Sequence, residues 1–257
     1  MKIVVAVKVL NDDKDIVVLP DRSLDYSMAH QVVSSYDLNA IEAAAQLMET
    51  CDNASLVAIS ASSAKADDPK VKKSILSRGP EELFLVADDA LTTADSFSTA
   101  QVLKKILDEQ VKDFDLIICG DGSADMYAGQ VDVQLATALG IPVINAVTSL
   151  KAENGKIIAE RTLDSEIEVV EIEMPAIVSV DPEIALPRIA GMREILAAGK
   201  KPATVNNAAA LGAEIDQKLT IEAIQAPEAA PRKNEIYDMS NDGDLDAFTT
   251  AVAKLLR

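Results

Sequence analysis

The sequence predicts an α/β protein with a doubly wound, mainly parallel sheet, an antiparallel hairpin insertion and a C-terminal arm. Three observations lead to this fold class. Short β-branched apolar runs alternate with helical patterns up to about residue 140, which is the rhythm of right-handed βαβ units. An Asn-Gly turn at residues 154–155 then separates runs of strand type. Beyond residue 205 the chain is rich in Ala, Asn, Pro and Glu, and only its end regains a helical pattern.

The first half of the chain supplies the strands and helices of the parallel sheet. Residues 3–10 are apolar on both faces, as expected for a central strand that helices cover on each side. Further strands are expected at residues 55–60, 83–87 and 115–119, and helices at residues 38–50, 70–77, 96–111 and 130–139. Asp37 precedes the first helix and is predicted to cap it. A loop of small residues, 61–66, is expected after the second strand.

The pattern changes after Asn145. Consecutive antiparallel strands are expected at residues 147–152, 156–163 and 166–173, within an insertion of about residues 146–173. The apolar run 176–181 is expected to rejoin the main sheet, so residues 1–205 are predicted to form one domain. A proline-interrupted stretch of about residues 182–195, called the docking loop below, carries large apolar residues beside a glycine and is either a core-capping loop or an exposed docking element. Residues 206–257 are predicted to form an extended arm that ends in a helix at 245–256.

Charge and composition exclude several functions. The formal net charge of −18 opposes nucleic acid and anionic membrane surfaces as partners, and the few lysine groupings are more typical of solvated faces. No apolar run is long enough for stable membrane insertion. Cys51, Cys119 and the single His30 lack metal-ligand or disulfide spacing, so a cytoplasmic location is expected.

No catalytic set is visible in the sequence. GxSxG, the Walker A lysine motif and GxGxxG are all missing, and His30 has no predictable partner. Cys119 ends a strand and is either a reactive thiol or a small core residue, of which the second is favoured. Small residues follow the strand ends at residues 6–8, 60–62 and 120–132. Because ligands bind at the carboxyl ends of strands at a topological switch point, these stretches form either a nucleotide crevice or ordinary turns.

Five stretches of the chain, in order, are similar to a known family. They are MKIVVAVKVLNDD from Met1, SSYDLNAIEAA from Ser34, LSRGPEEL from Leu76, CGDGSADMYAGQV from Cys119, and PAIVSVDPEIALPRIAGMREILAAGKKP from Pro175. The chain resembles the beta subunit of electron transfer flavoprotein, in the branch linked to anaerobic carnitine-type and nitrogen-fixation-type electron transfer. The resemblance implies a Rossmann-like fold and a non-catalytic half of a heterodimer, although members of the family can take part in electron bifurcation.

The resemblance also implies cofactors and binding residues. FAD would lie mainly on the alpha subunit, and this chain would bind AMP or a second FAD in its own crevice. The residues that would border the nucleotide are Ala6, Val7, Lys8, Asn39, Ser60, Ala61, Ser62, Asp121, Gly122, Ser123, Asp125, Tyr127, Ala128, Gly129, Gln130 and Val131. Asp132 stands where the family has a glycine. A carboxylate there would weaken an anion site unless its side chain points away.

Partners follow from the same resemblance. The docking loop, through Ile189, Gly191 and Met192, would anchor a flavin dehydrogenase such as an acyl-CoA dehydrogenase, and the arm would wrap the alpha subunit. The alternative is a stand-alone adenine-nucleotide-binding protein of the universal-stress type. The antiparallel insertion, the proline-rich docking loop and the long arm all argue against that alternative.

Overall fold

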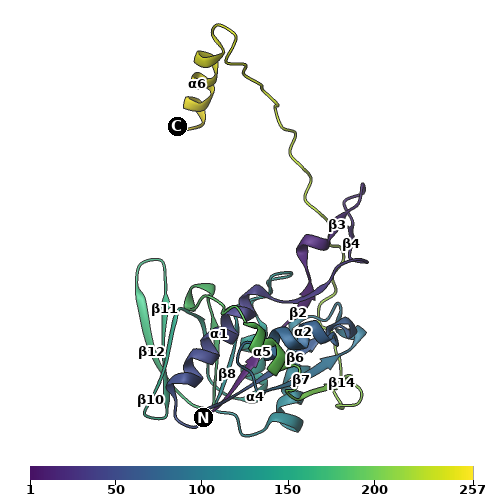
Figure 1. The fold of residues 1–257 in the computed structure, drawn as a ribbon, viewed down its shortest axis with the longest axis vertical. Coiled ribbons are helices and arrows are strands. Elements are labelled where there is room, and N and C mark those ends of the chain that lie inside the picture. Colours follow the sequence, from purple (N-terminus) through teal and green to yellow (C-terminus); the bar gives the residue numbers. More distant parts are fainter. Residues whose placement is uncertain (257) are drawn as a thin grey trace. The chain divides into compact units, whose positions relative to one another are not determined.

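The computed structural model describes residues 1–256 and confirms the predicted fold class. Seven parallel strands form the central sheet in the order β14-β7-β6-β1-β8-β13-β9 (Figure 1). Their bounds are β1 Lys2–Ala6, β6 Ser55–Ser62, β7 Glu82–Ala87, β8 Leu116–Gly120, β9 Val143–Val147, β13 Ala176–Val180 and β14 Ala203–Asn206. The chain winds outward from β1 in both directions, to β6 and β7 on one side and to β8 and β13 on the other.

Helices cover both faces of this sheet. Their bounds are α1 Ser35–Thr50, α2 Pro69–Leu76, α3 Ser96–Ile106, α4 Val131–Leu139 and α5 Met192–Ala198. Side chains of alternating strand residues enter two buried clusters, one with α1 and α2 and the other with α3 and α4. In β8, for example, Ile118 belongs to the first cluster and Ile117 to the second. The apolar runs are therefore buried on both faces, as a parallel strand requires.

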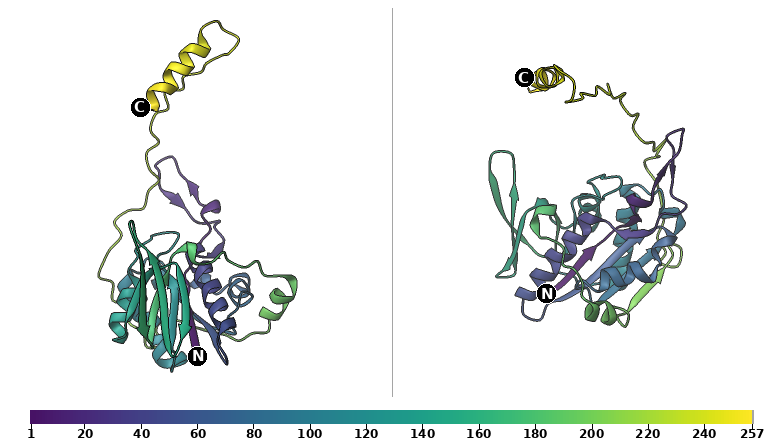
Figure 2. Two further views of the ribbon diagram at one scale, coloured as in Figure 1. Left: turned by 90° about the vertical axis from the view of Figure 1, so that its left-hand side faces the viewer. Right: turned by 45° about the horizontal axis from the view of Figure 1, so that its top comes forward.

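The predicted antiparallel insertion forms a separate three-stranded sheet (Figure 2). Its strands are β10 Ser149–Glu153, β11 Lys156–Thr162 and β12 Ile167–Glu173. Asn154 and Gly155 both have positive φ, 52° and 78°, which is the conformation that a tight hairpin turn needs. Ile157 and Ala159 are fully buried and join the cluster that includes α1, so the insertion packs on the α1 face of the main sheet.

Several element boundaries differ from the prediction. The run 3–10 does not form one strand: it divides into β1 and β2 (Val9–Asn11), and β2 pairs antiparallel with β5 (Gln31–Val33). β6 continues through Ser62, so the expected loop at 61–66 begins later. The helix predicted to end at residue 111 closes with a π-helical turn at Leu107–Val111. β9 and β14 were not predicted; both lie at the outer positions of the sheet and are only partly buried, so neither forms a continuous buried apolar run.

The chain divides into two compact units, of which the larger holds Met1–Val17 and Asp25–Ile224. Beyond residue 205 the chain continues to contact the core of this unit, where Ala208 is buried and Ile215 partly buried. The smaller unit holds Val18–Leu24 and the chain from Gln225 onward. β3 (Val17–Val18) pairs with β4 (Leu24–Asp25), and α6 (Asp244–Leu255) has no buried residue. Among the helices of residues 1–256, none has both the length and the apolar character that a membrane crossing requires.

Candidate functional site

The candidate site lies where β1 ends beside its two neighbours in the sheet, β6 and β8. The direction of winding reverses at β1, so this edge is the topological switch point at which open α/β sheets bind ligands. The loops after the three strands carry most of the predicted binding residues.

Asp37 joins two of these strand ends. It was predicted to cap α1, but Ser34 occupies the N-cap and Asp37 lies in the first turn of the helix, buried. Its carboxylate accepts the backbone N–H of Lys8 at 2.7 Å and that of Gly120 at 3.1 Å. Burial raises the pKa of Asp37 to about 7, although these two N–H donors favour the ionised form. One carboxylate therefore holds the ends of β1 and β8 together.

The residues after β1 and in β6 are bound mainly to each other. Val7 donates its N–H to the carbonyl of Ile59 at 2.9 Å, and both Ala6 and Val7 are buried. The Ser62 hydroxyl accepts the N–H of Val9 at 3.1 Å and lies 3.2 Å from the Ser60 hydroxyl. Ala61, between the two serines, is buried as well. The serine hydroxyls thus tie β2 to β6, and the backbone forms this wall of the crevice.

The loop after β8 folds over the strand end. The Tyr127 hydroxyl donates to Asp121 Oδ2 at 2.7 Å, and its ring lies 5.3 Å from that of Tyr36, centroid to centroid. The pKa of Tyr127 is raised to about 12, first by this hydrogen bond. Burial and neighbouring carboxylates raise the pKa of Asp121, whose other oxygen, Oδ1, is buried without a partner among the described residues. A Cβ at Gly122 would stand 2.3 Å from the Tyr127 ring, so only glycine fits beneath it.

Lys8 supplies a positive charge at this edge. Its ammonium lies 2.8 Å from Asp125 and 3.5 Å from the Ser123 hydroxyl. Burial, which raises the pKa of Asp125, is outweighed by Lys8 and the surrounding hydrogen bonds, so the net shift is downward. Lys8 links the end of β1 to the loop after β8.

The loop leads into α4 through an exposed backbone. Ala128, Gly129 and Gln130 are exposed, Gly129 has a φ of 60°, and Gln130 occupies the N-cap. Val131 begins the helix, and the amides of its first turn precede the first intrahelical hydrogen bond, made by Gln134. These N–H groups form a helix N-terminus behind an exposed loop, and a helix N-terminus favours anions.

Asp132 is bound to the neighbouring strand. Its carboxylate accepts the Ser179 hydroxyl of β13 at 2.5 Å, and both residues are buried, Asp132 at 5% exposure and Ser179 at 0%. The carboxylate still stands in the first turn of α4, so the weakening of an anion site by its charge stays a prediction. The neighbouring Cys119 thiol has a pKa well above its usual value because of burial and nearby carboxylates, which keeps it protonated and unreactive.

Asn39 does not direct its amide toward the crevice. The side-chain nitrogen donates to the carbonyls of Pro182 at 3.0 Å and Ala185 at 2.7 Å, which uses both of its N–H groups. Asn39 is thus engaged by the docking loop. The sequence did not indicate this role, nor the roles of Asp37, Tyr36 and Ser179.

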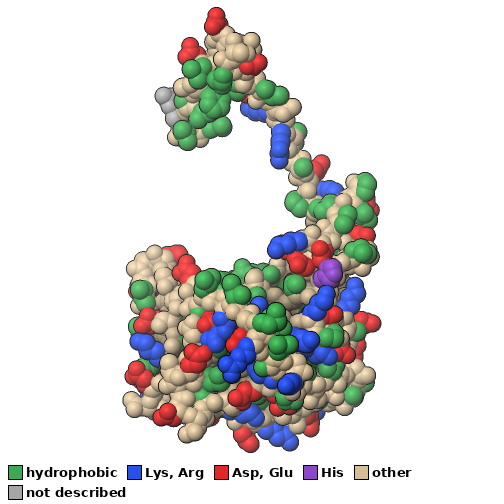
Figure 3. Space-filling view, viewed as in Figure 1, with side chains coloured by type: hydrophobic (Ala, Val, Ile, Leu, Met, Phe, Trp, Pro, Cys, Tyr) green, Lys and Arg blue, Asp and Glu red, His purple; other side chains and the backbone are tan. Residues whose placement is uncertain are grey.

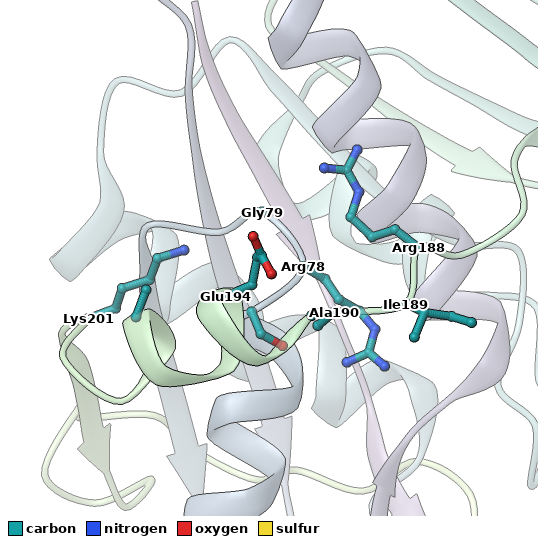
Figure 4. A pocket seen from close by; sticks show the side chains of 10 residues that line it. Arg78, Gly79, Arg188, Ile189, Ala190, Glu194 and Lys201 are labelled. Atoms are coloured by element: carbon teal, nitrogen blue, oxygen red, sulfur yellow. The ribbon is translucent and has the colours of Figure 1, made fainter.

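The docking loop exposes its apolar residues. Ile189 is 95% and Met192 73% exposed, and Gly191 is the N-cap of α5. Figure 3 shows hydrophobic side chains beside Lys and Arg around the position of α5. A cavity of about 500 Å³ beside the loop is lined by Arg78, Arg188, Ile189, Glu194 and Lys201, among others. In Figure 4 the guanidinium groups of Arg78, which follows α2, and Arg188, which precedes Ile189, point away from each other.

Within residues 1–256 no group of three or more His, Cys, Asp or Glu side chains could hold a metal ion. His30 is exposed and lies 2.8 Å from Asp15, a surface pair.

One comparison with known proteins bears on this arrangement. A family model described as the electron transfer flavoprotein domain matches residues 24–211. The match covers well over half of the chain and includes the loop after β8, the antiparallel insertion and the docking loop.

Proposed function

Because this chain belongs to the electron transfer flavoprotein domain family, we propose that it is the beta subunit of a heterodimeric electron transfer flavoprotein. Its family role is electron transfer, so its tasks are positioning, tuning of potential and docking rather than bond-making. The observation that carries the proposal is the family match, which includes β6, the loop after β8 and the docking loop. The sequence resemblance supports the beta subunit and the carnitine-type and nitrogen-fixation-type branch.

The crevice is proposed to bind an adenine nucleotide, either AMP or a second FAD. The backbone N–H groups of the first turn of α4 would serve as donors to phosphates, and Lys8, paired with Asp125 of the loop after β8, would supply a positive charge at the same edge of the sheet. Asp121 Oδ1 is a buried acceptor without a partner among the described residues. A ribose hydroxyl could donate a hydrogen bond to this oxygen. The hydrogen bond from Ser179 of β13 would keep the Asp132 carboxylate from facing a phosphate at the start of α4. FAD, when bound, would supply the electron-carrying chemistry, and the main redox FAD would lie on the alpha subunit.

Two protein partners are proposed. The exposed Ile189 and Met192 are suited to a hydrophobic pocket on a flavin dehydrogenase such as an acyl-CoA dehydrogenase. α6 presents unburied apolar residues, among them Leu245 and Phe248, which the alpha subunit would cover.

Calorimetric titration of the purified chain with AMP, FAD and adenosine tests the nucleotide proposal. AMP is expected to bind more tightly than adenosine, because only AMP brings a phosphate to Lys8 and α4. Lys8→Gln is expected to weaken the binding of AMP by about tenfold, because one charge interaction with the phosphate is lost. The affinity for adenosine should stay unchanged. Lys72→Gln, which alters a surface pair with Asp67, is the matched control. Absence of binding by both AMP and FAD, or equal losses for AMP and adenosine, would contradict the proposal.

A further inference from the structure

The docking loop has an unusual combination of irregular backbone and extensive contacts to the core. Its exposed apolar residues, Ile189 and Met192, cannot themselves fix its conformation, because they contact little of the chain. The conformation is instead fixed by polar side chains of α1 and by the stretch that follows α5.

Asn39 holds the beginning of the loop. Its two amide N–H groups bind the carbonyls of Pro182 and Ala185, which no strand or helix would otherwise satisfy. The amide is buried, so the loss of these bonds would leave polar groups without partners. Asn39 therefore fixes the backbone where it leaves β13.

Glu42 holds the loop one turn further along α1. It accepts Arg188 Nε at 2.5 Å, Arg188 Nη2 at 3.1 Å and the backbone N–H of Arg188 at 3.2 Å. Arg188 Nη1 also reaches Glu49 at 3.0 Å. Burial, which opposes the charge on Glu42, is outweighed by Arg188, so the net pKa shift of Glu42 is downward. A bidentate pair of this kind fixes orientation as well as distance.

The far end of the docking region is fixed independently. Lys201 donates to the carbonyls of Leu76 and Pro80 at 2.7 Å each, just after α2. Ala198, the last residue of α5, is 2% exposed. The exposed stretch 189–197 is thus supported on both sides.

We infer that Asn39 and Glu42 are positioning residues for partner docking, which hold the loop in the conformation that presents Ile189 and Met192. The inference rests on the proposed docking function. A loop that is already ordered loses less conformational entropy when a partner binds, so removal of the support should weaken association and leave the electron-transfer step unaltered. Neither residue contacts the partner in this account.

The test uses Asn39→Asp, which is isosteric and turns a carboxylate toward two carbonyl oxygens, and Glu42→Gln, which removes the charge. Asn53→Asp, the same change at an exposed loop position just after α1, is the control. Hydrogen–deuterium exchange on the full chain measures how well ordered the backbone of residues 183–190 is. Steady-state kinetics with the heterodimer as acceptor and an acyl-CoA dehydrogenase as donor measures docking through KM.

Both variants are expected to speed exchange in residues 183–190 and to raise KM for the heterodimer by about tenfold, with kcat unchanged. Nucleotide content should stay unchanged in Glu42→Gln, which alters no residue expected to border the nucleotide. The control should match the unmodified chain. Unchanged exchange, or faster exchange with unchanged KM, would overturn the inference. Failure of the proposed function would look different: the unmodified heterodimer itself would accept no electrons, whatever the exchange pattern.

Discussion

Single buried carboxylates control the geometry of the crevice. Asp37 accepts two backbone N–H groups that lie 29 and 83 residues away in the sequence, and Asp132 accepts a hydroxyl from β13. Both residues are buried. Burial makes the fold sensitive to the loss of the donors that these carboxylates accept.

Asp37 should make stability depend on pH with a defined sign. Its pKa is about 7 in the folded protein against an ordinary value of 3.8, so the folded state binds the proton more tightly. The contribution of Asp37 to the free energy of unfolding is therefore fully present below its ordinary pKa of 3.8 and is lost as pH rises through about 7. Denaturant unfolding across this window should show that the unfolding free energy of the unmodified chain, minus that of Asp37→Asn, falls as pH rises. If the unfolding free energies of the two proteins changed in parallel with pH, the raised pKa of Asp37 would be contradicted.

Ser179→Ala should destabilise the protein by about 1–3 kcal/mol, because the buried Asp132 carboxylate would lose its hydroxyl donor. Ser98 provides the matched control: it is equally buried, but its hydroxyl has no partner among the described residues. Ser98→Ala should therefore cost little. Chemical denaturation compares the unfolding free energies of the two variants directly. Equal losses of unfolding free energy would show that the hydrogen bond to Asp132 does not add to stability.

Sequence alone could not assign these roles. Asp37 has the residue type and position of a helix cap, so local pattern favours a cap, whereas the actual contacts come from segments far away in the chain. The same holds for Asn39, whose partners lie 143 and 146 residues away. Residue type predicts that a buried polar group will find a partner, but tertiary structure decides which one.

At the scale of elements, the long apolar runs were predicted well and the outer strands were not. β8 and β13 are continuous buried runs, whereas β14 reads ATVN and is partly polar. The antiparallel insertion was recognisable because its turn needs Asn-Gly. The strand at 3–10 was predicted too long, since its apolar pattern continues through the break where Lys8 donates its N–H to Asp37 instead of to a neighbouring strand.

The docking loop is the element that the proposed function tests most easily. Met192→Ala should slow electron exchange with an acyl-CoA dehydrogenase, raising KM by about tenfold, because an exposed apolar anchor is lost. Flavin and nucleotide content should stay unchanged. Met28→Ala removes a similarly exposed methionine elsewhere and serves as control. Loss of bound flavin in the Met192 variant would mean that this element supports the fold instead.

At the scale of the whole molecule, the larger unit has its own core and the smaller one does not. Apolar side chains of α6 are unburied, with Leu245 at 61% and Leu255 at 85% exposure. Exposed apolar surface on this scale marks a protein interface. The described chain thus comprises one folded body and one segment whose apolar side chains are exposed, and we propose that the alpha subunit covers that segment.

Truncation after Ala226 should therefore leave the folding of the remaining chain intact while weakening its assembly with the alpha subunit. The thermal unfolding midpoint of the remaining chain should change little, because α6 contributes no buried residue. Gel filtration with the alpha subunit should show a weakened heterodimer. An unchanged elution profile of the mixture would contradict the proposed role of the arm.

The nucleotide and flavin content of the co-purified complex tests the central claim most directly. The chain is co-expressed with an electron transfer flavoprotein alpha subunit, the complex is isolated and denatured, and the released nucleotides are identified and counted. We expect a stable heterodimer with FAD on the alpha subunit and one further adenine nucleotide, AMP or FAD, per copy of this chain. A monomer that forms no complex and releases neither AMP nor FAD would contradict it.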